Sequence, residues 1–279
     1  MIKTNFHTHT DFCDGKNTPE EMVLSAIEKG IQILGFSGHS LYPFSDDWHI
    51  PSLKHNEYCK EILSLKEKYA DKIQILLGFE TDFVPGVDCF SALKKDFKPD
   101  YQIGSVHFIF KEAGFFTVDG SVQECLNGIE KVFANDKKAA VCEYFALQRQ
   151  MLKKGGFELW GHPDLVQKFN SKLHWFDPQD SWYKNELKAC VELAAKSSVV
   201  AEVNTGGMAR GYTKEPYPAL PFLTMLKEAG VPVTISSDCH NSSQIDFGFD
   251  IALEQIKKAG YKEIAYLAAG STIKMQKID

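Results

Sequence analysis

Short apolar runs alternate with longer amphipathic stretches along almost the whole chain. This alternation constrains the fold more than any other feature, because strands separated by helices pair in parallel through right-handed crossovers. Seven apolar runs predict strands, at residues 2–6, 32–37, 73–78, 101–106, 158–161, 199–203 and 231–236. Seven or eight such units are more typical of a closed barrel than of an open sheet, so the sequence predicts an α/β barrel.

The stretches between these runs have the apolar spacing of helices. The first helix has the clearest boundaries: Thr18 can cap its start, Pro19 suits its first position, Glu21 completes a capping box and Gly30 ends it. Seven further helices are predicted, at residues 53–69, 87–97, 122–135, 138–153, 181–197, 219–229 and 249–259, and a short strand at 263–266 can follow. No repeat, low-complexity run or linker interrupts the pattern, so residues 1–279 are predicted to form a single domain.

Composition excludes several classes of protein. The formal net charge is −6 and only two of the 31 basic residues are arginines, which argues against a general nucleic-acid binder. No apolar stretch reaches the ~18 residues of a membrane span, and the N-terminus lacks the apolar segment of a secretory signal, so a cytoplasmic protein is expected. The seven cysteines form no CxxC pair, which excludes a thiolate zinc site and a disulfide framework.

Side chains that can bind metal ions follow the predicted strands, at or just beyond their ends. They are, in chain order, His7, His9, Asp14, His39, Glu80, His107, His162, Asp238 and His240. The carboxyl ends of barrel strands meet on one face, where active sites lie. Six of the nine histidines follow strands in this way, so the sequence predicts one shared metal site.

The spacing of these residues supports a shared site. His7 and His9 are two apart, as are Asp238 and His240, so on extended chain both members of each pair point the same way. Cys239 and Thr8 then point away. Nine ligands exceed the four or so that one zinc takes and suit two or three divalent ions. Imidazole and carboxylate donors without thiolate permit zinc, manganese, iron or cobalt.

Such a site suggests an anionic substrate in spite of the acidic composition. The charge of three divalent ions would exceed that of Asp14, Glu80 and Asp238, so the pocket could attract a phosphate dianion. Arg210, which follows the loop Asn204–Gly207, is a candidate bidentate phosphate clamp, although a solvated surface arginine is the alternative. The backbone of the loop that begins at Asn204 can approach a ligand closely.

Three further features keep two interpretations each. Asp164 either orients the metal-bound imidazole of His162 or caps a helix. The loop Leu41–Trp48, which includes Asp46, either binds a cationic or aromatic substrate group or packs over the barrel. The remaining histidines, His49, His55 and His174, are interpreted as structural or surface residues.

Six motifs together resemble the PHP (polymerase and histidinol phosphatase) superfamily of metal-dependent phosphoesterases. They are Phe6–Thr10, Gly38–Ser40, Gly78–Glu80, Gly104–His107, Gly161–Asp164 and Ser237–His240, in order along nearly the whole chain. Within this resemblance, Glu202–Gly207 followed by Tyr217-Pro218 is similar to the stand-alone histidinol-phosphate phosphatases.

The resemblance implies a distorted (β/α)7 TIM-like barrel with three metal ions and a definite sharing of ligands. One ion would be held by His7, His9, Glu80 and Asp238, a second by Glu80, His107 and His162, and a third by Asp14, His39 and His240. Related enzymes often carry a basic residue soon after the His-x-Asp element, which implies that Lys168 shares phosphate binding with Arg210. With these two, Asn204 is a candidate substrate-binding residue.

The resemblance therefore implies hydrolysis of a small phosphate monoester, most of all L-histidinol phosphate in histidine biosynthesis, by a hydroxide held by the metals. Asp238, His240 and Arg210 would carry catalysis. Two alternatives remain. The same site can act on phosphotyrosine proteins, nucleotides or phosphodiesters, or it can bind metal without catalysis. The sequence leaves the metal identity, the general acid and the oligomeric state open.

Overall fold

The computed structural model describes residues 1–42, 44, 47–268, 270 and 272–278. Its centre is a sheet of seven parallel strands whose spatial order follows the chain. The strands are β1 (Thr4–Asn5), β2 (Ile33–Ser40), β3 (Gln74–Asp82), β4 (Tyr101–Ser105), β7 (Leu159–Trp160), β8 (Val200–Asn204) and β9 (Val233–Ser236). This arrangement confirms the predicted α/β barrel, with all seven strands at the predicted places.

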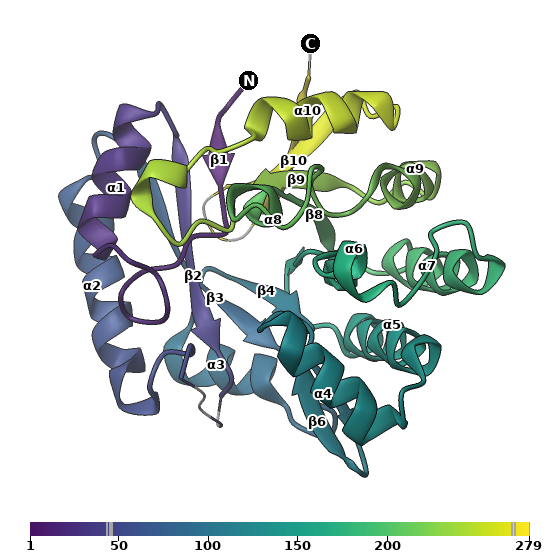
Figure 1. Ribbon diagram of the computed structural model, residues 1–279. Helices are drawn as coiled ribbons and strands as arrows, with labels where there is room; N and C mark the ends of the chain where they lie inside the picture. Colours follow the sequence, from purple (N-terminus) through teal and green to yellow (C-terminus); the bar gives the residue numbers. More distant parts are fainter. Residues whose placement is uncertain (43, 45–46, 269, 271, 279) are drawn as a thin grey trace.

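Helices surround the strands on the outside of the barrel (Figure 1). The longer ones are α1 (Pro19–Glu28), α2 (His55–Lys68), α3 (Cys89–Phe97), α4 (Val122–Phe133), α5 (Lys137–Lys154), α7 (Ser181–Ala194), α9 (Leu220–Glu228) and α10 (Phe249–Lys258). The capping box predicted for the first helix is present: the Glu21 N–H donates to Thr18 Oγ1, and the Glu21 carboxylate accepts from the Thr18 N–H. Two short helices, α6 (Asn170–Leu173) and α8 (Gly206–Ala209), lie in loops. No described helix is long and apolar enough to cross a membrane.

The barrel closes where its first and last strands meet. Thr8 and Cys239 form a parallel β-bridge beyond the ends of β1 and β9, and the His9 N–H donates to the Cys239 carbonyl oxygen at 3.0 Å. The seam therefore joins the segment His7–His9 to the segment Asp238–His240. Successive side chains of a strand point in opposite directions. The side chains of Thr8 and Cys239 therefore point one way, and those of the residues before and after each of them point the other way, toward the carboxyl end of the barrel.

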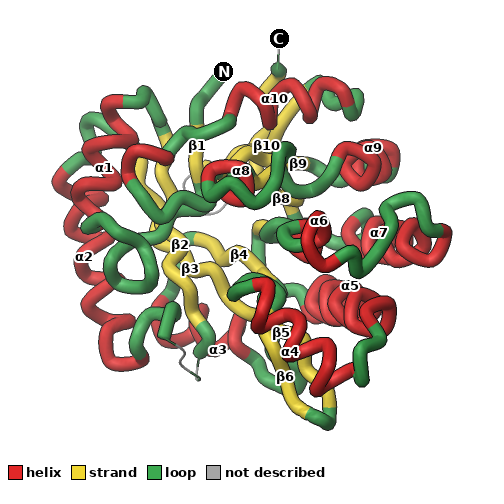
Figure 2. The backbone as a smooth tube through the Cα atoms, in the orientation of Figure 1, coloured by secondary structure: helices red, strands yellow, loops and turns green. Residues whose placement is uncertain are grey.

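The barrel interior below the seam is apolar. Phe6, Ile33, Leu76, Ile103, Leu159 and Val200 form one buried cluster with Ala265 and Leu267. The last two belong to the antiparallel hairpin β10 (Glu263–Ala268) and β11 (Thr272–Lys277), which packs against Ile33 and Val200 at the amino-terminal ends of β2 and β8 and lies beside β9 (Figure 2). Buried polar side chains, among them His39 and Glu80, lie at the opposite end, where the carboxyl termini of the strands are.

One element near this polar end was not expected from the sequence. Directly after His107 the chain forms the hairpin β5 (Phe108–Lys111) and β6 (Gly114–Thr117), apart from the barrel sheet. Gly114 has a φ of +136°, which an L side chain rarely adopts. The run of aromatic residues on both sides of this glycine was a strand signal that the β/α pattern obscured.

Candidate metal centre

All nine predicted metal ligands lie at the carboxyl ends of the barrel strands. Each belongs to at least one group of three or four side chains whose ligand atoms are within 4.8 Å of one another. The parallel register explains part of this arrangement, since β2 and β3 place His39 directly beside Glu80. The structure thus brings together the nine side chains that the sequence predicted to share one site.

Glu80 is the centre of the arrangement and is completely buried. Its two carboxylate oxygens lie within 3.5 Å of nitrogens of His7, His9, His39, His107 and His162. Oε1 is 2.8 Å from His162 Nε2, and Oε2 is 2.9 Å from His39 Nδ1. Ser105 also donates its hydroxyl to Oε1, at 2.7 Å. A carboxylate whose two oxygens face different sets of imidazoles has the geometry of a bridging ligand.

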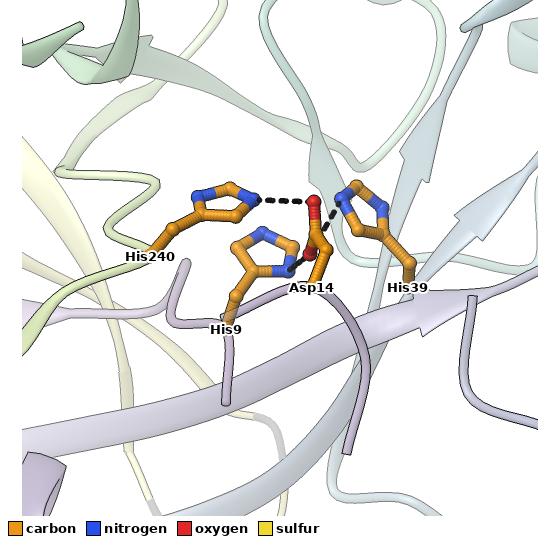
Figure 3. A group of neighbouring side chains, drawn as sticks. All are labelled: His9, Asp14, His39 and His240. Carbon is orange, nitrogen blue, oxygen red and sulfur yellow. Dashed lines mark ion pairs between the residues drawn. The ribbon is translucent and has the colours of Figure 1, made fainter. Parts of the chain in front are cut away.

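Asp14 forms the outer part of the centre (Figure 3). Its carboxylate lies 3.1 Å from His240 Nε2, 3.7 Å from His39 Nε2 and 3.9 Å from His9 Nδ1. The rings of His9 and His240 stack with centroids 4.1 Å apart. The Asp14 side chain keeps about a third of its surface exposed, so this part of the centre opens to solvent.

Asp238 lies between these two parts. Its Oδ1 is 3.3 Å from His9 Nε2 and 3.8 Å from His7 Nε2, and its Oδ2 pairs with Arg210 Nη2 at 2.9 Å. The backbone at Asp238 has a φ of +49°, and that at His162 a φ of +23°. Non-glycine residues held in this region carry strain that typically costs about 1–3 kcal/mol and often occurs at functional sites.

Several buried polar atoms of the centre have no hydrogen-bond partner among the described residues. These include His7 Nε2, His9 Nε2, His39 Nδ1 and Glu80 Oε2. Buried polar atoms are almost always satisfied, and a site for a bound ion is one of the standard reasons for an exception. Here the unsatisfied nitrogens face a carboxylate oxygen, which is the donor set that divalent zinc, manganese or iron prefers. The residues therefore fit divalent metal ions.

The pKa shifts in the centre also favour bound metal ions. Burial alone would lower the pKa of His7, but the carboxylates of Glu202, Glu80 and Asp238 outweigh it and raise that pKa well above its usual range. Burial also lowers the pKa of His107, but Asp82 and Glu80 outweigh this effect and raise the pKa to about 10. The buried carboxylates thus attract positive charge, which metal ions can supply.

Two acidic residues that the sequence analysis missed hold the imidazoles in place. Glu202 Oε1 is 2.7 Å from His7 Nδ1, and its Oε2 accepts from the His162 N–H at 3.0 Å. Asp82 lies 2.8 Å from His107 Nδ1. Both are completely buried. Acidic residues inside apolar strands are almost never buried without a partner, and this is the signal that could have revealed them.

We expect Glu202→Gln to weaken metal binding about 10- to 100-fold, because a carboxylate that fixes a ligand imidazole usually contributes that much. A chelator-competition titration of the folded protein measures the affinity. Glu186→Gln is the matched control, since Glu186 pairs with Arg149 between α5 and α7. Equal metal affinity in Glu202→Gln and wild type would mean that Glu202 does not orient a ligand.

The residues predicted to contact substrate lie beside the metal centre. Arg210 also donates to the Asp238 carbonyl oxygen at 3.0 Å, and its side chain is about a quarter exposed. Asn204 is completely buried, and its amide contacts Glu202 and Asp238 at 2.9 and 3.3 Å. This placement suits a residue that orients Asp238. Lys168 is nearly buried and bonds to Asp119.

Asp164 follows neither of its two expected roles. Its side chain makes no helix-cap hydrogen bond, and His162 Nδ1 has no partner among the described residues. Instead Asp164 Oδ2 accepts from the Ala219 N–H at 2.9 Å, and burial raises the pKa of the carboxyl to about 6. Asp164 therefore ties the loop after β7 to the start of α9.

The loop Leu41–Trp48 reaches the centre at its far end. The Trp48 ring meets the rings of His39 and His107 edge-on, with centroids 4.6 and 5.2 Å apart. His49, which was interpreted as structural, is buried against Asp82 at 2.7 Å. Asp46 lies outside the described residues. Trp48 thus forms one wall of the centre.

Comparisons with known proteins agree with this geometry. A family model described as PHP domain matches residues 5–206. A probable histidinol-phosphatase of Deinococcus radiodurans is 27% identical over 264 residues, which cover 93% of this chain and 95% of that protein. The histidinol-phosphatase of Bacillus subtilis is 25% identical over 272 residues, which cover 91% of this chain and 100% of that protein.

A solved structure has the same barrel. It is histidinol phosphate phosphatase from Lactococcus lactis, complexed with Zn, L-histidinol and phosphate. The TM-score is 0.71 and the sequence identity 21%, with 98% of this chain and 99% of that chain covered. This likeness shows the shared TIM-like fold, and in this chain that fold carries the nine predicted ligand side chains at the carboxyl ends of its strands.

Proposed function

The chain belongs to the PHP domain family, and we propose that it is a metal-dependent phosphomonoesterase that hydrolyses L-histidinol phosphate to L-histidinol and phosphate. The observation that carries the proposal is the group of nine imidazole and carboxylate side chains that converge beside Arg210, several of which have buried atoms without a hydrogen-bond partner among the described residues. The relatives named histidinol-phosphatase support the substrate, and with it a place in histidine biosynthesis.

Three divalent ions are proposed, with zinc, manganese or iron as candidates. His7, His9, Glu80 and Asp238 would hold one ion, and Glu80 with His107 and His162 would hold the second. Asp14, His39 and His240 would hold the third. Such ions supply Lewis acidity, which activates water as a nucleophile and stabilises charge on phosphoryl oxygens.

The side chains of this protein then position the ester. Arg210 is a planar donor at the edge of the centre, and it is proposed to bind two phosphate oxygens while both terminal nitrogens also hold Asp238, Nη1 through the carbonyl oxygen and Nη2 through Oδ2. Asp238 and His240 are proposed to act with it at the reacting phosphate. Asn204 would contribute by holding Asp238, and Lys168 by adding positive charge near the phosphate.

Arg210→Ala is expected to raise the KM for phosphate esters about 10- to 100-fold, because a hydrogen bond to a charged group contributes about 1.5–3 kcal/mol. Steady-state kinetics on L-histidinol phosphate measure this change. Arg149→Ala removes the other arginine of the chain, which pairs with Glu186 far from the centre, and should leave KM unchanged. An unchanged KM in Arg210→Ala would remove Arg210 from the phosphate site.

The substrate is tested by phosphate release from L-histidinol phosphate, p-nitrophenyl phosphate, AMP and a phosphotyrosine peptide, with metal content measured on the same preparation. A much higher kcat/KM for L-histidinol phosphate, with two or three ions per chain, is expected. A preference for the peptide or AMP would indicate a PHP-type phosphatase of another substrate. Full metal content without turnover would indicate a binding module.

Residues 1–279 are proposed to act as one catalytic domain. The match to the family model ends at residue 206, yet Asp238 and His240 lie beyond it and complete the centre across the barrel seam. The proposed substrate is a small phosphorylated molecule, and a cytoplasmic location remains a prediction.

A further inference from the structure

Asp119 is fixed at the edge of the metal centre by the hairpin that follows His107. The chain returns from β6 beside its own starting point, where the Val118 N–H donates to the His107 carbonyl oxygen at 2.8 Å. The next N–H, that of Asp119, donates to Thr117 Oγ1 at 3.1 Å. The backbone of Asp119 is therefore anchored next to a residue of the centre.

One oxygen of the Asp119 carboxylate is already engaged. Its Oδ1 and its backbone carbonyl oxygen both accept from the Lys168 ammonium, the carbonyl at 2.7 Å. That ammonium also lies 4.5 Å from the ring centroid of Tyr212 and 5.1 Å from that of Phe169, and the Lys168 side chain is only 5% exposed. Asp119 Oδ2 has no hydrogen-bond partner among the described residues, and the side chain is 22% exposed.

The other carboxylates of the centre are committed elsewhere. Glu80 and Asp238 face the ligand histidines, Glu202 fixes His7, and Asp82 lies between His49 and His107; all four are buried. Asp14 is more exposed but is paired with His240. Among the carboxylates described around the centre, Asp119 is the one that keeps an accessible oxygen while lying outside the proposed ligand set.

The Asp119 carboxylate places a negative charge beside the proposed phosphate site. Burial raises the pKa of this carboxyl, but Lys168, His107 and Arg210 outweigh that effect and hold it below its usual range, so the group is ionised at neutral pH. In a phosphate ester of a 2-amino alcohol, only the chain N–C–C–O–P separates the ammonium from phosphorus. An acid adjacent to the phosphate site is therefore needed to meet that ammonium.

We propose that Asp119 is the specificity-determining residue that binds the ammonium group of the substrate, so that the protein selects phosphate esters of amino alcohols over esters without that charge. This inference rests on the proposed function. Lys168 holds Asp119 in position through Oδ1, and the substrate ammonium binds at Oδ2.

The test compares L-histidinol phosphate with 3-(imidazol-4-yl)propyl phosphate, which lacks only the amino group. In Asp119→Asn, kcat/KM for L-histidinol phosphate is expected to fall about 10- to 100-fold, while that for the desamino ester stays within about threefold of wild type. Glu112→Gln, an exposed acid at the turn of the same hairpin, is the matched control and should keep the wild-type preference. Asp119→Glu, which retains the negative charge, should keep part of the preference for L-histidinol phosphate.

Product inhibition provides a second measurement. Asp119→Asn and Asp119→Ser are expected to weaken inhibition by L-histidinol and to leave inhibition by inorganic phosphate unchanged. An equal fall of both esters, or a rise in the inhibition constant for phosphate, would mean that Asp119 acts through Lys168 and would overturn the inference. Equal turnover of both esters by the wild type would also overturn it, whereas no turnover of L-histidinol phosphate would overturn the proposed function itself.

Discussion

Replacement of Glu80 by glutamine is expected to remove both bound metal and nearly all phosphatase activity. The two Glu80 oxygens lie within 3.5 Å of five imidazoles, so this one side chain contributes to two of the three proposed ions. An amide keeps the shape but loses the charge and offers one oxygen. The loss in kcat/KM should exceed the roughly 10- to 100-fold typical of a residue that only orients a ligand.

Metal content by elemental analysis and kcat/KM on the same preparation measure this result. His7→Ala and Asp238→Ala should behave similarly, because each removes a ligand from the buried part of the centre. Asp246→Asn, which changes a carboxylate that pairs with Lys3 on the surface, is the control. Wild-type activity at a wild-type metal content in Glu80→Gln would refute the bridging role.

Removal of metal by a chelator is expected to abolish activity reversibly and to lower the thermal unfolding midpoint. A ligand that binds only the folded state stabilises it by about 4 kcal/mol when its free concentration is about 1,000 times its Kd. The centre holds several carboxylates at or near full burial, and without ions their charge is balanced by histidines and, at Asp238, by Arg210. Differential scanning calorimetry of the apo and metal-loaded protein measures the difference.

Re-addition of zinc, manganese or iron, one at a time, then identifies the ion that restores activity. The midpoint and the activity should recover together for an ion that occupies the buried ligands. Activity that survives complete removal of metal would contradict the proposed chemistry. An unchanged midpoint with lost activity would mean that the ions bind only at the exposed side, around Asp14.

Much of the fold and of the centre could be predicted because both depend on local patterns. The alternation of apolar runs with helical stretches set the strand order, since parallel strands joined by crossovers follow the chain. The same pattern predicted where the candidate ligands lie, because residues at the carboxyl ends of barrel strands meet on one face of the barrel. His39 and Glu80 are examples: neighbouring strands bring them side by side.

The parts that were missed depend on tertiary contacts. Glu202 was seen as part of a motif, but its bond to His7 joins residues 195 positions apart and no spacing reveals it. The β5–β6 hairpin lies outside the repeating unit, so the alternation gave no place for it. Asn204 was expected to bind substrate, and only the structure shows how deeply it is buried behind Asp238.

The seam between Thr8 and Cys239 has a consequence for how the protein is made. Ligands on the first and last strands must meet there, so a ribosome has to translate past His240 before the centre can exist. Domains generally fold as units during synthesis, and contacts between distant segments form late. A nascent chain released before that point would hold most of the barrel helices but would lack Asp238 and His240, so the first and third proposed ions would each miss a ligand.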